Sequence, residues 1–241
     1  MMKQRLDNIV VAKGMVASRS QAESFIKLGK VLVDGRVVTK SGCFVDENAK
    51  IELVVENQYV SRAGLKLESV AKILKLDFRD KIVLDVGSST GGFTDFALRN
   101  GAKKVYAVDV GTDQLHPSLR GNKKIELHEK TDIRDFYTKE MPDVIVIDVS
   151  FISLRDILPH LYNYLSDEHT QIVAMVKPQF EAGKGQTNKG IIKNDSMRRQ
   201  ILKDFEDWSR QYFAITNKRD SDVAGAKGNQ ERFYLLKPLN K

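Results

Sequence analysis

The sequence has very few of the residues that build disulfide frameworks and metal clusters. Cys43 is the single cysteine among 241 residues, so no disulfide can form within the chain and a cysteine metal cluster is excluded. The four histidines are scattered, at positions 116, 128, 160 and 169. We therefore expect no metal site and a reducing, cytoplasmic setting.

Long apolar runs are also absent. No window approaches the roughly 18 apolar residues of a membrane span, and the N-terminal segment MMKQRLDNIVVAKG lacks the apolar stretch of a signal peptide. A membrane is therefore not an expected partner. A net charge of +7 and a pI of about 9.3 are instead common among nucleic-acid-binding proteins, although charge alone is weak evidence.

Residues 1–55 read as a small α+β module. Apolar residues follow helical spacing from Leu6, and the Ser-x-x-Glu capping box at Ser20 predicts the start of a second helix. Asp34-Gly35 between two β-branched runs is a strong hairpin signal. The module holds nine Lys/Arg and six Asp/Glu, which indicates either a solvated face or a surface that contacts phosphates.

After a short linker at residues 56–62, apolar β-rich runs alternate with helical patterns from residue 63 onward. This alternation predicts an α/β fold, with a mostly parallel sheet that has helices on both faces. Residues 181–196 are the segment expected to form a long mobile loop.

A glycine-rich turn, DVGSSTGGF, follows the first of these runs at residues 85–93. No Gly-Lys-Ser/Thr follows it, and its G-x-x-x-G-G spacing differs from that of dinucleotide-binding proteins. A nucleoside cofactor without a pyrophosphate fits better, and we expect S-adenosylmethionine. The residues expected to bind it here are Asp85, Gly87, Ser88, Ser89, Thr90, Gly91, Gly92 and Phe93. Asp85 would meet the ammonium group of the cofactor, directly or through water.

Two further aspartates follow the next predicted strands. Asp109, followed by Val110, is placed to accept hydrogen bonds from ribose hydroxyls. Asp132 is expected to contact the adenine amino group. A single aspartate of this kind is more often a helix cap, but three at successive strand ends favour a cofactor site.

Charged residues also follow the two remaining apolar strands. Asp148 ends VIVID and Lys177 ends VAMVK, while Lys66 lies on a helix before the first strand and Glu231 starts a late strand. A hydroxyl must lose its proton as it attacks a methyl group, and lysine suits general-base work when it is partly buried. We assign Lys177 as the base, with Lys66, Asp148 and Glu231 as tuning and positioning groups. Asp148 also borders the expected cofactor site.

Several segments together resemble the TlyA family, in which an S-four-like RNA-binding domain precedes an FtsJ-like methyltransferase domain. They include YVSRAGLKL, DVGSSTGGFTD, AVDVGTDQL, DVSFISL, VKPQFEAG and GAKGNQE, together with Arg5-Leu6-Asp7 and Ser18-Arg19. The resemblance implies an RNA-binding domain at 1–55 and a Rossmann-like, S-adenosylmethionine-dependent domain at 63–241. It also implies that Lys66, Asp148, Lys177 and Glu231 form a catalytic tetrad.

The activity implied by the resemblance is methylation of a ribose 2′-hydroxyl, on a cytidine of large-subunit ribosomal RNA and, in some members of the family, also of small-subunit ribosomal RNA. The expected partners are ribosomal RNA or ribosomal subunits, without an obligate protein partner. The residues expected to contact RNA are Arg5, Ser18, Arg19, Lys27, Lys30, Arg36 and Arg62.

Two alternatives stay open. Some members of the family carry the name haemolysin, which suggests a membrane-lysing protein, although the sequence offers no strongly apolar amphipathic helix. The other alternative is a ribosome-binding module whose methyltransferase domain is catalytically silent.

Overall fold

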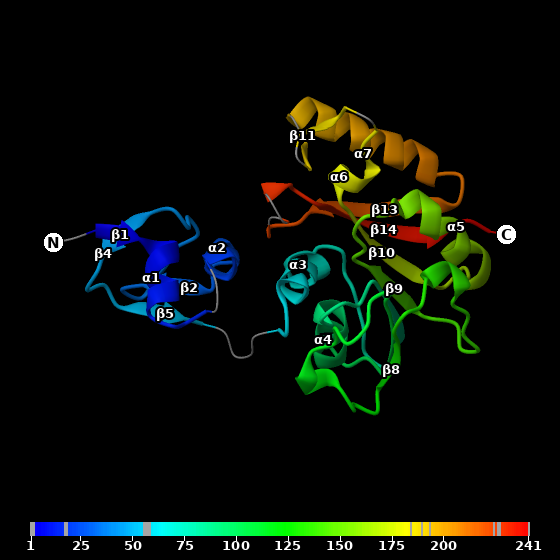
Figure 1. Cartoon of the computed structure of the whole chain (residues 1–241), viewed down its shortest axis with the longest axis horizontal. Helices are drawn as coiled ribbons and strands as arrows, with labels where there is room; N and C mark the ends of the chain where they lie inside the picture. The colour runs from blue at the N-terminus through cyan, green and yellow to red at the C-terminus, as the bar shows by residue number, and fades with distance from the viewer. Residues whose placement is uncertain are drawn as a thin grey trace.

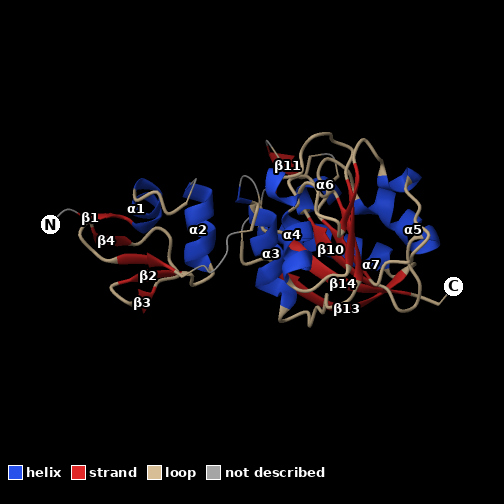
Figure 2. Ribbon diagram, turned by 90° about the horizontal axis from the view of Figure 1, so that it is seen from below, coloured by secondary structure: helices blue, strands red, loops and turns tan. Residues whose placement is uncertain are grey.

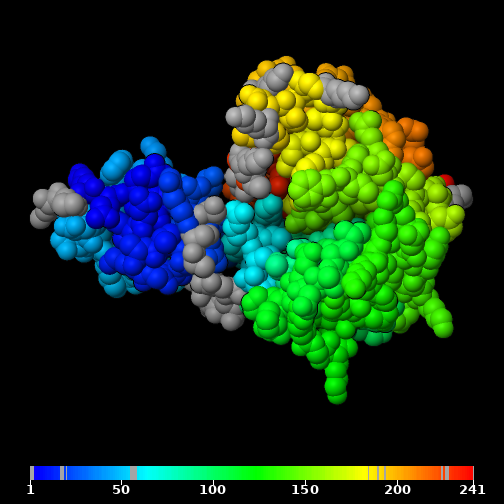
Figure 3. Space-filling model, viewed as in Figure 1, coloured from blue at the N-terminus to red at the C-terminus, as the bar shows by residue number. Residues whose placement is uncertain are grey.

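The computed structural model of the chain describes residues 3–16, 19–54, 59–183, 185–188, 190–192, 194–223, 225 and 228–240. These residues form a small N-terminal lobe and a larger lobe (Figures 1 and 3). The prediction for Ser18 lies outside the described residues.

The small lobe packs two helices against short antiparallel strands. The elements are β1 (Lys3–Arg5), α1 (Leu6–Ala12), α2 (Arg19–Lys27), β2 (Val31–Val33), β3 (Arg36–Val37), β4 (Phe44–Asp46) and β5 (Ile51–Leu53). The predicted hairpin joins β2 to β3, and Asp34 and Gly35 both have positive φ, 49° and 75°, as this tight turn requires. The predicted cap at Ser20 is wrong, because α2 already includes Arg19.

The two lobes touch through apolar and charged contacts. Leu65 and Val223 of the large lobe belong to the same buried cluster as Leu6, Phe25 and other residues of the small lobe. Nζ of Lys30 lies 2.6 Å from both carboxylate oxygens of Glu68. The contact surface therefore lies between α2 with the turn after it and α3 (Arg62–Ala71).

The large lobe alternates strands and helices. Its elements are α3 (Arg62–Ala71), β6 (Ile82–Val86), α4 (Gly92–Arg99), β7 (Lys104–Val108), η1 (Pro117–Leu119), β8 (Ile125–His128), η2 (Ile133–Asp135), β9 (Val144–Ile147), α5 (Leu154–Tyr164), β10 (Gln171–Val176), α6 (Pro178–Glu181), β11 (Thr187–Asn188), β12 (Ile191–Ile192), α7 (Asp195–Ser209), β13 (Phe213–Asp220) and β14 (Arg232–Pro238). α3 begins at the last residue of the predicted linker. The segment 181–196 is more regular than predicted, because it contains the β11–β12 pair and the start of α7.

Seven strands form one sheet in the order β13-β14-β10-β9-β6-β7-β8. The neighbours from β10 to β8 pair in parallel, and β14 is antiparallel to both β10 and β13. The chain first builds outward from β6 to β8 and then returns to the other side of β6 with β9. Ligands of such sheets bind at the carboxyl ends of the strands near this change of direction. The predicted α/β fold class is confirmed.

Helices cover both faces of this sheet (Figure 2). Alternate strand residues point to opposite faces, so Leu84 packs with α5 and α7, whereas Val83 packs with α3 and α4. Burial on both faces explains why the strands read as continuous apolar runs.

Candidate active site

The carboxyl ends of β6, β9 and β10 bring the predicted residues together. Asp148 directly follows β9 and Lys177 directly follows β10. Glu231 precedes β14, which runs in the opposite direction, so its start lies at the same edge of the sheet. Val176 pairs with Arg232, and therefore Lys177 and Glu231 are neighbours across these two strands.

Two cavities open at this edge and share Gly87, Ser89, Asp148 and Ser150 as lining residues. The smaller cavity has a volume of about 160 Å³ and the larger one about 380 Å³. Except for Gly91, every residue predicted to bind the cofactor lines at least one of them.

Among the described residues that line the smaller cavity, Oδ1 of Asp85 and Oγ of Ser88 are buried and have neither a hydrogen bond nor an ion pair to another described residue. Oδ2 of Asp85 accepts a hydrogen bond from the Thr94 hydroxyl at 2.6 Å. Burial raises the pKa of Asp85 to about 7, against the hydrogen bond from Thr94 and with a further contribution from the charge of Asp148. A buried carboxylate oxygen without a partner is costly. An ammonium group in this cavity would satisfy it.

Two glycines give the turn its shape. Gly87 has φ 78°, and a Cβ at this position would lie 2.9 Å from the carbonyl oxygen of Asp148. Gly91 has φ 89° and forms the N-cap of α4. Residues other than glycine rarely adopt this conformation, so Gly91 allows the turn to form. Gly91 itself lines neither cavity.

The larger cavity is lined by Asp109, Val110 and Asp132. Oδ2 of Asp109 accepts from the backbone N–H of Ser89 at 2.8 Å, which holds the carboxylate at the cavity. Val110 is 71% exposed there. Asp132 caps η2 and forms two hydrogen bonds with the Arg134 guanidinium, so it has a structural role as well. Each carboxylate oxygen can accept more than one hydrogen bond, which leaves capacity for a ligand.

These groups fit S-adenosylmethionine. Asp85 and Ser88 offer an acceptor and a hydroxyl for its amino-acid end, and Asp109 offers acceptors for ribose hydroxyls. The apolar lining of the larger cavity, including Val110 and Ile133, suits an adenine ring.

The predicted tetrad forms two ion pairs. Nζ of Lys177 lies 2.5 Å from Oδ1 of Asp148, and Nζ of Lys66 lies 2.6 Å from Oε2 of Glu231. Both lysines are 9% exposed, and Glu231 is 2% exposed. Lys177 also lines the smaller cavity. A lysine amine thus faces the cavity that would hold the amino-acid end of the cofactor.

Gly225 makes room for Glu231. A Cβ at position 225 would collide with the Glu231 carboxylate. The turn is closed by hydrogen bonds from the Gly225 N–H to the Asn229 carbonyl and from the Ser221 N–H to the Glu231 carbonyl, at 2.9 and 3.0 Å. The glycine therefore determines where the carboxylate can lie.

Sequence reasoning assigned no role to Ser150 and Phe151. Ser150 Oγ accepts a hydrogen bond from Nζ of Lys177 at 2.9 Å. Phe151 is 92% exposed, lines the larger cavity and has φ 66°, which is unusual for a residue other than glycine. Their position two and three residues after Asp148, within the DVSFISL segment, was the available signal.

The residues predicted to contact RNA have different surroundings. Arg5 and Arg19 both bind the buried carboxylate of Asp7, at 2.7 and 2.9 Å. Asp7 has a lowered pKa, chiefly because of the hydrogen bond from Arg5. The buried aspartate therefore fixes both guanidinium groups near the surface.

The other basic candidates are more scattered. Lys27 and Arg36 are exposed, and Arg62 is half-buried at the first turn of α3. Lys30 already has a partner within the protein, Glu68 of the large lobe. A phosphate would have to compete with that carboxylate.

Comparison with known proteins agrees with this architecture. The FtsJ-like methyltransferase family model matches residues 59–237, and the S4 domain model matches residues 4–51. The chain is 37% identical to the 23S rRNA (cytidine-2′-O)-methyltransferase TlyA of Campylobacter jejuni, with 93% of this chain and 96% of the relative covered. It is 34% identical to the 16S/23S rRNA (cytidine-2′-O)-methyltransferase TlyA of Mycobacterium tuberculosis, with 97% and 89% covered.

Other relatives carry a different name. Hemolysin A of Brachyspira hyodysenteriae is 41% identical, with 94% of this chain and 97% of the relative covered. A solved structure from Streptococcus thermophilus, also named after the hemolysins, superimposes with a TM-score of 0.74 at 38% identity, covering 100% of this chain and 90% of that chain. Within the described part of the chain, no helix combines the length and the apolar character needed to cross a membrane. The chain therefore belongs to the TlyA family of S-adenosylmethionine-dependent methyltransferases, in which an S4 domain is joined to an FtsJ-like domain.

Proposed function

We propose that this protein transfers a methyl group to a ribose 2′-hydroxyl of ribosomal RNA, on a cytidine of the large subunit, with the small subunit as a second candidate substrate. The observation that carries the proposal is the position of Lys177, whose amine lies beside Asp148 at the cavity that contains the Asp85 oxygen for which the described residues provide no partner. The names of the Campylobacter and Mycobacterium relatives support the substrate. Such a substrate requires the enzyme to act in the cytoplasm.

When bound, S-adenosylmethionine supplies an electrophilic methyl group. Asp85 would hold the ammonium end and Asp109 the ribose hydroxyls. In the proposed reaction, Nζ of Lys177 takes the proton of the attacking hydroxyl, which requires the amine first to release the proton that it carries in the ion pair with Asp148. Asp148 and Ser150 contact that atom at 2.5 and 2.9 Å, so they orient the amine and stabilise the ammonium that forms. Most of the rate then comes from positioning.

Lys66 and Glu231 complete the proposed set. Glu231 lies next to Lys177 across the paired strands, and its ion pair with Lys66 holds both side chains at the sheet edge. Together they provide a second amine and a carboxylate that can hydrogen-bond the ribose.

Phe151 is proposed to contact the target nucleotide. RNA-binding proteins commonly stack unpaired bases on exposed aromatic rings. The ring is almost fully exposed and only one residue from Ser150, which binds the proposed base.

We propose that the domain functions follow the predicted boundaries, with RNA binding at 1–55, a linker at 56–62 and methyl transfer at 63–241. On the small lobe, Arg5, Arg19, Lys27 and Arg36 are the proposed phosphate contacts, with Lys30 available once Glu68 is displaced. Neutralising the first four should weaken RNA binding and flatten its salt dependence.

The test is transfer of radiolabelled methyl groups to separated ribosomal subunits from a strain lacking the protein, followed by mapping of the product. Label on a ribose 2′-oxygen is expected with the wild-type protein. Lys177→Ala should abolish transfer and spare cofactor binding, while the exposed Lys203→Ala serves as a matched control. Full activity of Lys177→Ala would remove the base assignment, and absence of cofactor binding by the wild type would favour the silent-module alternative.

The hemolysin names favour a second candidate, membrane lysis. It predicts leakage from liposomes treated with the purified protein, unaffected by substitutions in the glycine-rich turn. Absence of leakage, together with methyl transfer to ribosomal RNA, would leave the first proposal alone.

A further inference from the structure

Two loops carry the residues that surround the proposed base. The loop between β9 and α5 holds Asp148, Ser150 and Phe151, and the segment from the end of β10 through α6 starts with Lys177. Because β9 and β10 are paired neighbours in the sheet, the two loops leave it side by side.

Glu181, the last residue of α6, connects these loops. Its Oε2 accepts a hydrogen bond from Ser153 Oγ at 2.6 Å, and its Oε1 accepts one from the backbone N–H of Leu154 at 2.7 Å. Nε of Arg155 lies 3.8 Å from Oε2. The Glu181 side chain is 1% exposed, and burial raises the pKa of its carboxyl. Both carboxylate oxygens thus bind the start of α5.

Capping of α5 alone does not account for these contacts. Ser153 already caps the helix, because its Oγ accepts from the Arg155 N–H at 3.1 Å and its carbonyl accepts from the Asp156 N–H at 3.1 Å. A glutamate within the first turn of a helix could complete such a cap. Here the carboxylate comes from a residue 27 positions further along the chain, so its distinctive effect is to join two loops.

Phe151 needs such support. A left-handed backbone at a residue other than glycine is strained and persists only where its surroundings hold it. The Phe151 ring contacts the ring of Phe180, with 5.2 Å between centroids. The loops are therefore joined at three levels: Lys177 with Asp148 and Ser150, the two rings, and Glu181 with the start of α5.

From this arrangement we propose that Glu181 is a positioning residue for methyl transfer. It holds the loop 148–153 against the segment 177–181, so that Phe151 and Lys177 keep the spacing that the substrate ribose requires. Glu181 acts through these residues and does not itself touch the reacting atoms. The inference rests on the proposed function, because that reaction gives the spacing its role. A misplacement of about 1 Å can cost about a hundredfold in rate, so loss of the carboxylate should lower kcat about ten- to a hundredfold.

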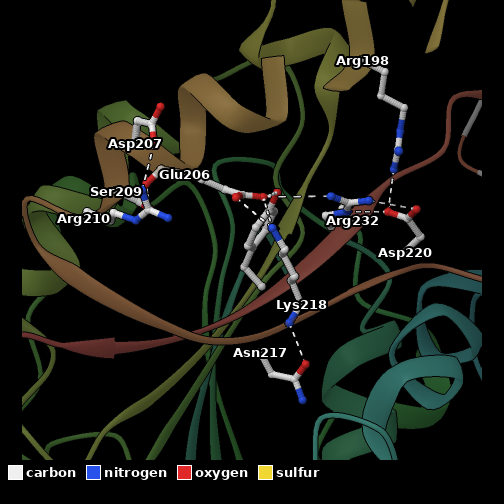
Figure 4. A network of polar contacts seen from close by, with 10 residues as sticks. Arg198, Glu206, Asp207, Ser209, Arg210, Asn217, Lys218, Asp220 and Arg232 are labelled. Atoms are coloured by element: carbon white, nitrogen blue, oxygen red, sulfur yellow. Dashed lines mark hydrogen bonds and ion pairs between the residues drawn. The ribbon is translucent and has the colours of Figure 1, made fainter. Parts of the chain in front are cut away.

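The test compares Glu181→Ala and Glu181→Gln with Glu206→Ala in the full chain. Glu206 is a suitable control because it is another largely buried glutamate, and its carboxylate contacts Lys218 on β13 and Tyr234 on β14 rather than a residue of either loop (Figure 4). Both alanine variants should lower Tm. Only Glu181→Ala should lower kcat at saturating RNA and cofactor, with the Kd for S-adenosylmethionine unchanged.

Glutamine should restore most of the activity, because it keeps an acceptor for the Leu154 N–H and can donate to Ser153 Oγ. If Glu181→Ala does not fold, Ser153→Ala removes one of the two hydrogen bonds and should give a smaller loss of the same kind. Unchanged kcat in a folded Glu181→Ala protein would overturn the proposal. So would equal losses in the alanine and glutamine variants, because hydrogen bonding would then not be the cause.

A second readout does not depend on the substrate. Hydrogen exchange of the backbone amides in residues 148–156, measured without RNA, should be faster in Glu181→Ala and unchanged in Glu206→Ala. Unchanged exchange in both would overturn the positioning role even if methyl transfer is confirmed. Conversely, faster exchange in Glu181→Ala alone would support the joining of the two loops by Glu181 even if ribosomal RNA proves not to be methylated, a result that would refute only the proposed function.

Discussion

Binding of S-adenosylmethionine should weaken about tenfold between pH 8 and pH 6, because Asp85 must be ionised to pair with an ammonium group. Burial raises the pKa of this carboxyl to about 7 in the free protein. About nine-tenths of the molecules are then ionised at pH 8 and about a tenth at pH 6, and apparent affinity scales with the competent fraction. The expected loss corresponds to about 1.4 kcal/mol.

The assay is isothermal titration calorimetry with the cofactor across this pH range, in wild type and Asp85→Asn. The asparagine variant should bind more weakly at pH 8 and show a flatter profile. Titration of the cofactor itself affects both proteins, so the difference between their pH profiles reports the titration of Asp85. Thr94→Val, which removes the hydrogen bond at 2.6 Å, should shift the wild-type profile toward higher pH. A wild-type affinity that is constant from pH 6 to 8 would refute the reasoning.

Three further predictions follow from neighbouring features. Phe151→Ala should weaken binding of the transition state for methyl transfer to RNA by about 1–3 kcal/mol, the range for one stacked base, whereas Phe151→Trp should retain activity. Equal single-turnover rates of Phe151→Ala and the wild type would contradict the stacking role. Gly225→Ala should displace the Glu231 carboxylate, with which a Cβ would collide, and reduce kcat without changing the Kd for the cofactor in a binding assay. Asp220→Ala should lower the free energy of unfolding in urea by about 2 kcal/mol, because Arg198 and Arg232 would both lose the carboxylate that they share (Figure 4). A loss smaller than the error of the measurement would show that these ion pairs do not stabilise the protein.

The large sheet could be predicted because its strands are buried on both faces and end in polar residues. Val83 and Leu84 belong to opposite cores, so the run containing them is apolar without interruption. β1 gave no such signal, because Lys-Gln-Arg shows no apolar alternation and its pairing with β4 arises only in the folded lobe. The start of α2 was misplaced because a capping motif does not exclude a helix that begins earlier.

Site residues could be predicted where they directly follow a strand, because the end of the strand then determines where the side chain lies. Asp148 and Lys177 follow paired strands, and they meet. Glu181 was not assigned, because its role depends on a partner in another loop that no local pattern identifies. Lys30 shows the same limit, because no local pattern around it predicts the ion pair with Glu68 of the large lobe.

The position of β14 within the sheet has a consequence for biosynthesis. β14 comes last among the elements along the chain, yet it inserts between β13 and β10. N-terminal parts of a nascent chain generally fold first, so Asp148 and Lys177 can pair while Lys66 still lacks Glu231. The complete set of four side chains exists only after residues 231–238 have emerged from the ribosome and entered the sheet. Unfinished chains are therefore expected to remain inactive even where their cofactor cavity has already formed.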